Sequence, residues 1–139
     1  MKRALSSICL MGVLLFGFLG CGKSGPPRFP VSGAVTFKGT PVTEGMITFY
    51  LQDGGGVVAF IDPSGNFVMD KGLVEGQYRV YIEPPPTIMT PPPPGGPPKT
   101  PPKTFPNFPE KYRQAATSGL LATVEAKSSG NTFKFDMLP

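Results

Sequence analysis

From residue 31 onward, apolar and polar side chains alternate along the chain with a period of two, the pattern of a half-buried β-strand. No part of this region shows a helical period longer than three turns. We predict strands at 31–38, 45–52, 57–61, 67–69, 77–83, 120–126 and 132–137. Seven short strands with frequent turns between them predict an all-β fold, a seven-stranded antiparallel β-sandwich.

Glycine, proline and small polar residues mark the connections between these strands. We expect turns at 39–41 and 62–66, a connection at 72–76, and a hairpin turn at 128–131 that joins the last two strands. The longest connection, 84–109, contains 13 of the 19 prolines. Because proline lacks the N–H that a β-ladder needs, this insertion cannot be interior sheet. We expect a long loop prone to polyproline II.

Residues 1–20 have the three parts of an export signal peptide. Lys2 and Arg3 give a positive start, and the apolar stretch that follows is shorter than the about 20 residues of a spanning helix. The end, GFLGCG, resembles a lipobox, in which small or aliphatic residues precede a lipidated cysteine. This resemblance implies cleavage between Gly20 and Cys21 and lipidation of Cys21. The alternatives are an uncleaved anchor and an ordinary signal peptide with a chance cysteine.

Cleavage would remove Cys9 and leave one acylated cysteine, so the exported domain is predicted to hold no internal disulfide. More than one acyl chain would hold the protein durably on a membrane. Position 22 is Gly, not the Asp that retains lipoproteins in the inner membrane of two-membrane bacteria. That resemblance implies the outer membrane, with the domain facing the periplasm or the exterior. We expect a flexible tether at 21–30 and the sandwich domain at 31–138.

Four phrases of the domain resemble the carboxypeptidase-regulatory-like, or transthyretin-like, domains of bacterial lipoproteins. They are VSGAVTFKGTPVTEGMITF, IDPSGNF, LVEGQYRVYIEP and FPEKYRQAATSGLLATVEAKSSGNTFKFDM. Together they cover most of residues 31–137 outside the proline-rich insertion. The resemblance implies a seven-stranded, prealbumin-like sandwich with a non-catalytic accessory role outside the cytoplasm. It implies no catalytic residue, because the family pattern consists of turn glycines and core positions.

Several kinds of catalysis lack the residues they need. The chain has no His, which excludes a Ser-His-Asp triad and an imidazole metal ligand. A Ser–Lys pair needs a desolvated lysine, whereas Lys127 and Ser128 are adjacent in an expected exposed turn. Without Lys2 and Arg3, 11 basic residues face 9 acidic ones, a net charge of +2 that gives no reason to expect nucleic acid.

Metal and carboxylate chemistry also lacks a distinct signal. Asp62, Ser64 and Asn66 alternate as in the start of a calcium loop, but Leu73 stands where the bidentate glutamate belongs. A turn accounts for these three residues. No pair of acids is singled out for glycoside hydrolysis. We therefore expect no cofactor and no metal.

A basic, proline-stiffened arm is the best candidate for contact with an envelope protein or polysaccharide. Its residues are Lys99, Lys103, Phe105, Phe108, Lys111, Tyr112 and Arg113. The alternative is that the three aromatic residues dock the loop on the sandwich while the basic ones keep it soluble.

A second candidate is a sugar-binding platform of exposed aromatic rings, Tyr50, Tyr81 and Phe105. Ordinary cross-strand aromatic pairs are the alternative. The sequence thus predicts a lipid-anchored, non-catalytic binding or structural module of the cell envelope. A carbohydrate-binding accessory domain is the second hypothesis, and an enzyme or enzyme subunit has the least support.

Overall fold

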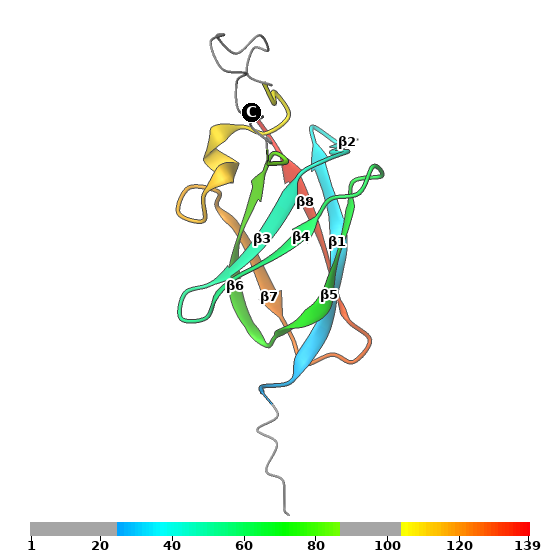
Figure 1. Cartoon of the computed structure of the whole chain (residues 1–139), viewed down its shortest axis with the longest axis vertical. Coiled ribbons are helices and arrows are strands. Elements are labelled where there is room, and N and C mark those ends of the chain that lie inside the picture. Colours follow the sequence, from blue (N-terminus) through cyan, green and yellow to red (C-terminus); the bar gives the residue numbers. More distant parts are fainter. Residues whose placement is uncertain (1–24, 87–103) are drawn as a thin grey trace, which may run out of the picture.

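The computed structural model describes residues 25–86 and 104–139, and they form two open β-sheets packed face to face (Figure 1). The first sheet contains β1 (Arg28–Phe37), β2 (Thr40–Pro41), β5 (Asn66–Val74) and β8 (Asn131–Met137). The second sheet has the order β4 (Gly55–Phe60), β3 (Met46–Leu51), β6 (Gly76–Glu83), β7 (Leu120–Val124). The short 3₁₀ helix η1 (Glu110–Arg113) precedes β7. The predicted all-β fold is confirmed.

The structure has eight strands where the sequence predicted seven, because β2 is a strand of two residues. The expected turn moves back by one residue: Lys38 and Gly39 have positive φ of 51° and 75°. Thr40 and Pro41 then return alongside the end of β1, where Thr36 faces Pro41. Two residues are too few to show an alternation, so the pattern could not reveal this strand.

The predicted antiparallel topology is wrong at one pair, since β8 runs parallel to β1 over its whole length. The hairpin predicted at 128–131 is also wrong, because β7 and β8 do not pair with each other but belong to different sheets. β7 pairs with β6 in the second sheet, and the chain then crosses to the first sheet before β8 begins. Alternation tells which side of a strand is buried, but not which strand lies beside it.

The first strand begins earlier than expected and β5 ends later. Arg28 and Phe29 pair with Val74 and Leu73, so the last residues of the expected tether belong to β1. The predicted connection at 72–76 is largely strand, with a bulge around Gly72. A Cβ on Gly72, whose φ is 61°, would lie 2.7 Å from the Phe29 carbonyl oxygen. Only glycine fits this bulge without strain.

The core lies between the sheets, and its centre is the ring of Phe49 on β3. This ring lies within 5.8–6.1 Å, between centroids, of four other rings: Phe67, Tyr78, Phe133 and Phe135. These four come from β5, β6 and β8, so one side chain joins both sheets. The inward positions predicted by alternation, such as Val35 and Ile82, are fully buried.

The two ends of the sandwich differ. The start of β1 lies at one end, and the segment 104–118 and the C-terminus lie at the other (Figure 1). Within residues 25–86 and 104–139, no helix is long and apolar enough to cross a membrane.

Candidate binding surfaces

The described part of the predicted arm, 104–113, lies against the sandwich within a longer segment, 104–118, that leads to β7. Phe108 and Tyr112 are only 3% and 6% exposed and belong to the core cluster. Phe108 packs so close to Gly45 that a Cβ there would lie 2.8 Å from the ring. The Tyr112 hydroxyl accepts a hydrogen bond of 3.0 Å from the Leu138 amide. These two rings therefore anchor the segment and are not on the surface, as the docking alternative expects.

The basic residues of this segment also bind within the molecule. The Arg113 guanidinium donates to the Phe108 carbonyl through Nε at 3.0 Å and Nη2 at 2.7 Å. Lys111 donates to the Pro139 carbonyl oxygen at 3.0 Å, and its Nζ lies 4.9 Å from the centre of the Tyr112 ring. Segment 104–118 is thus tied to itself and to the end of the chain.

Four of the predicted site residues, Gly20, Cys21, Lys99 and Lys103, lie outside the described residues. Two small surface hollows lie near the described part of the arm. One is lined by Phe37, Lys38, Thr40, Pro41 and Asn107, and the other by Thr104, Phe105, Pro106 and Arg113. Neither lining contains a carboxylate, so neither offers the paired acids of a hydrolase.

The outer side of the second sheet is unusually apolar. Tyr50 (37% exposed), Val58 (51%), Phe60 (73%) and Leu121 (63%) all project from it, while their strand neighbours such as Phe49 face the core. They are four of the six large exposed apolar side chains in the described residues. With the half-buried Tyr81 they form what we call the outer apolar face. Exposed apolar side chains that gather on one face of a protein often mark a binding site.

Strand register arranges this face in rows across the sheet. The middle row is Val58, Thr48 and Tyr81. On one side of it lies the row Phe60, Met46 and Glu83. On the other side lies the row Gly56, Tyr50, Arg79 and Leu121. Thr48 is only 2% exposed although it points outward, so its neighbours already cover it.

The predicted platform is brought together in part. Tyr50 and Tyr81 share the outer apolar face, in adjacent rows of neighbouring strands. Phe105 is not part of this face: it packs against the core, edge-on to Phe108 at 6.0 Å. Sequence reasoning missed Val58, Phe60 and Leu121. The uninterrupted apolar run 57–61 was the available signal, because consecutive strand residues point to opposite faces and both faces must then be apolar.

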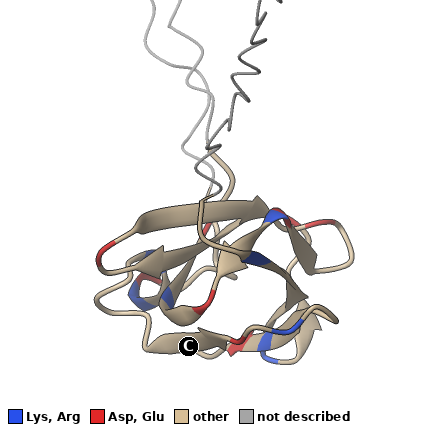
Figure 2. Cartoon of the chain, turned by 90° about the horizontal axis from the view of Figure 1, so that it is seen from below, with Lys and Arg blue, Asp and Glu red and all other residues tan. Residues whose placement is uncertain are grey.

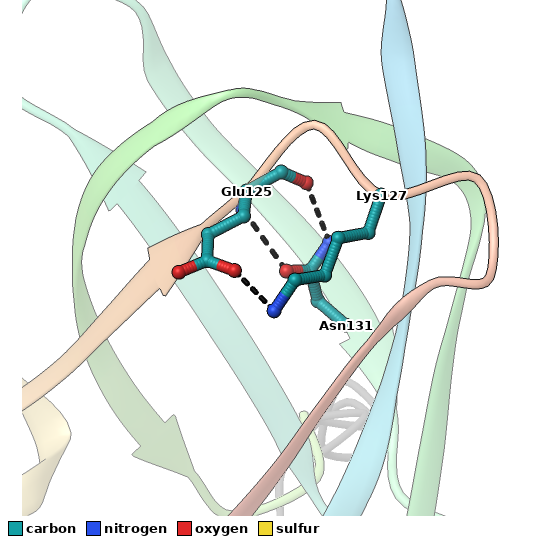
Figure 3. A network of polar contacts seen from close by, with 3 residues as sticks. All are labelled: Glu125, Lys127 and Asn131. Carbon is teal, nitrogen blue, oxygen red and sulfur yellow. Dashed lines mark hydrogen bonds and ion pairs between the residues drawn. The ribbon is translucent and has the colours of Figure 1, made fainter.

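Charged side chains are sparse and scattered over the described ribbon (Figure 2). The Asp62 carboxylate accepts from the amides of Ser64 and Asn66 at 2.8 and 2.9 Å, so it holds the turn that the sequence predicted there. Lys127 forms an ion pair with Glu125 in the connection between β7 and β8, shown in Figure 3. Across the described ranges, no group of three or more acidic or cysteine side chains could hold a metal ion.

One tyrosine, Tyr78, and one aspartate, Asp136, have shifted pKa values with structural causes. Burial raises the pKa of Tyr78, whose hydroxyl donates to the Val74 carbonyl at 2.9 Å. The Thr36 hydroxyl and the Gly39 amide, at 2.6 and 2.9 Å, lower the pKa of Asp136. Both contacts join strands or a turn, so neither shift points to acid–base catalysis.

Comparisons of the chain with known protein families, with curated proteins and with solved structures found no match. The outer apolar face is therefore the candidate site on its geometry alone. It offers rings, aliphatic side chains and two charges, Arg79 and Glu83, on a rigid sheet. Such a surface can bind a partner.

Proposed function

We propose that this protein is a lipid-anchored, non-catalytic module of the cell envelope that binds or supports a partner through its outer apolar face. The observation that carries the proposal is the gathering of Tyr50, Val58, Phe60 and Leu121, each 37–73% exposed, on one side of one sheet. Exposing so much apolar area to water is unfavourable unless a partner covers it. We further propose that the domain is transthyretin-like, as the sequence resemblance implies, and the two-sheet, all-β architecture is compatible with this proposal.

The anchor is proposed from the leader that ends at Cys21. We expect that a Cys21→Ala variant leaves the membrane fraction, or stays there only with its leader uncleaved, since the thioether cannot form. Mass spectrometry of the full chain from its native membrane should show an acylated Cys21 as the first residue. A chain that keeps residue 1 and carries no acyl group contradicts the anchor, whichever fraction holds it.

Carbohydrate binding is the second candidate, and one observation favours it: Tyr50 and Tyr81 lie on the same outer face with Arg79 facing Tyr50. Aromatic rings stack on the apolar sides of sugars, and charged groups can bond the hydroxyls. We expect saturable quenching of tyrosine fluorescence by an envelope glycan, abolished in Tyr50→Ala. Tyr112→Phe is the matched control, because that ring is buried elsewhere. The absence of any response to envelope glycans removes this candidate.

An enzymatic role has the least support. The two hollows and the outer apolar face bring no nucleophile next to a base and no pair of acids together within the residues described. Contact through Lys99 and Lys103 of the arm stays a prediction.

A further inference from the structure

We infer that the outer apolar face binds the same face of a second copy of this chain, around a two-fold axis that runs along the row Val58–Thr48–Tyr81. This goes beyond the proposed function, because it names the occupant of the surface and does not depend on the lipid. A two-fold interface uses one self-complementary patch on both copies. The question is whether the rows on either side of the axis complement each other.

The axis lies midway between the second sheets of the two copies, parallel to both sheets and perpendicular to their strands. Rotation about it places β6 antiparallel to β6 of the second copy and exchanges the two flanking rows. Three opposed pairs follow from the observed register: Phe60 with Gly56, Met46 with Tyr50, and Glu83 with Arg79. Two packed sheets stand about 10 Å apart, which such side chains span.

Each of these pairs is complementary in a different way. Phe60 is the most exposed large apolar side chain on this face, at 73%, and it would sit over Gly56, which has no side chain. A Cβ at Gly56 would lie 3.0 Å from the Thr48 Cγ2 methyl group, so a side chain at this position would crowd the neighbouring strand. Met46 would meet the ring of Tyr50, and sulfur contacts with aromatic rings are favourable.

The charges supply the most selective pair. Arg79 and Glu83 lie on one face of β6, about 13 Å apart, and neither has an ion-pair partner within the described residues. The two-fold axis brings each one against the opposite charge of the second copy, twice per dimer. A packing with the two β6 strands parallel would instead oppose Arg79 to Arg79, which like-charge repulsion disfavours. Charge therefore selects the antiparallel arrangement.

Cross-linking in the membrane tests the geometry directly. Tyr81 lies on the axis, so two copies of a Tyr81→Cys variant should be joined by a short bismaleimide when the full chain is in its native membrane. Val68→Cys is the matched control, because Val68 is 61% exposed on the other sheet. We expect a band of twice the chain's mass for Tyr81→Cys and none above the parent chain for Val68→Cys. Equal bands for both, or none for either, overturn the inference.

Charge reversal tests the pairing. Arg79→Glu and Glu83→Arg each place two pairs of like charges opposite one another in the dimer. Each should lower the yield of the Tyr81→Cys cross-link at least about tenfold. Combining both changes restores opposite charges and should restore the cross-link. A double variant as weak as the single ones overturns the inference, provided thermal melting shows that it is folded. Restoration by the double variant distinguishes a second copy from a glycan, because a glycan carries no matching charge reversal. The same pattern of cross-links should appear with a purified chain that carries no acyl group.

Discussion

At the residue scale, Asn131 shows how one polar side chain holds the crossover between the sheets. Its Oδ1 accepts from the Glu125 amide at 2.9 Å and its Nδ2 donates to the Glu125 carbonyl at 3.0 Å (Figure 3). The side chain thereby replaces a strand partner for the residue that follows β7. Asn131 is 7% exposed, so water cannot readily take over either bond.

We expect Asn131→Ala to lower the free energy of unfolding by about 1–3 kcal/mol, because two partly buried backbone groups lose their partner. Urea unfolding followed by tyrosine fluorescence measures this change. Asn131→Asp is the matched control: it keeps the acceptor but cannot donate to the Glu125 carbonyl, and should also destabilise. An Ala variant as stable as the parent contradicts the role given to this side chain.

Asp136 makes stability depend on pH in the acid range. Its pKa is lower in the folded state, because the charged form accepts the bonds from Thr36 and Gly39. Its contribution is therefore present above about pH 4, the ordinary Asp value, and is lost as the pH falls through the lower folded pKa. Asn at this position cannot titrate. We therefore expect Asp136→Asn to lose less melting temperature than the parent chain when the pH falls from about 5 to about 2. An unchanged profile would contradict it.

At the element scale, the segment 104–118 has little regular structure, and its order comes from anchors. Two buried rings, Phe108 and Tyr112, hold it to the core, and Arg113 closes it with two hydrogen bonds to one carbonyl. The buried Ser118 hydroxyl donates to the Val80 carbonyl and joins the end of the segment to β6.

Arg113→Ala should loosen this segment more than it destabilises the sandwich. We expect roughly 1–2 kcal/mol of lost local stability, since a charged donor makes both bonds. Amide hydrogen exchange should quicken within 104–118 and stay unchanged in β3 and β6. Arg113→Lys keeps the charge but not the planar pair of donors, and should fall between parent and Ala. Uniform quickening over the whole chain would show that Arg113 serves global folding instead.

The elements themselves were largely predictable, because a period of two needs only neighbouring residues. All seven expected strands exist, and inward residues such as Ile47 and Val80 are buried. Their partners were not predictable: the parallel placement of β8 depends on residues about a hundred positions away. The bulge at Gly72 was hidden as well, since a glycine in a short sequence window resembles a turn.

At the scale of the whole molecule, the candidate site was predictable only in part. Tyr50 and Tyr81 were recognised as rings, whereas Phe60 and Leu121 became visible only when β4 and β7 were seen at the outer positions of the second sheet. The sequence could not tell whether Phe108 is buried as an anchor or exposed as a binding residue, because an aromatic side chain suits both roles.

The parallel pairing of β1 with β8 has a consequence for the order in which the molecule assembles. Residues 31–37 of β1 pair with β2 and β5 nearby in the sequence, but their parallel neighbour lies at 131–137, about a hundred residues later. Contacts this distant in sequence slow folding, because a large loop must close before they stabilise anything. The first sheet therefore cannot be completed on a ribosome until residue 137 has been synthesised, although its β1–β5 pair can form earlier.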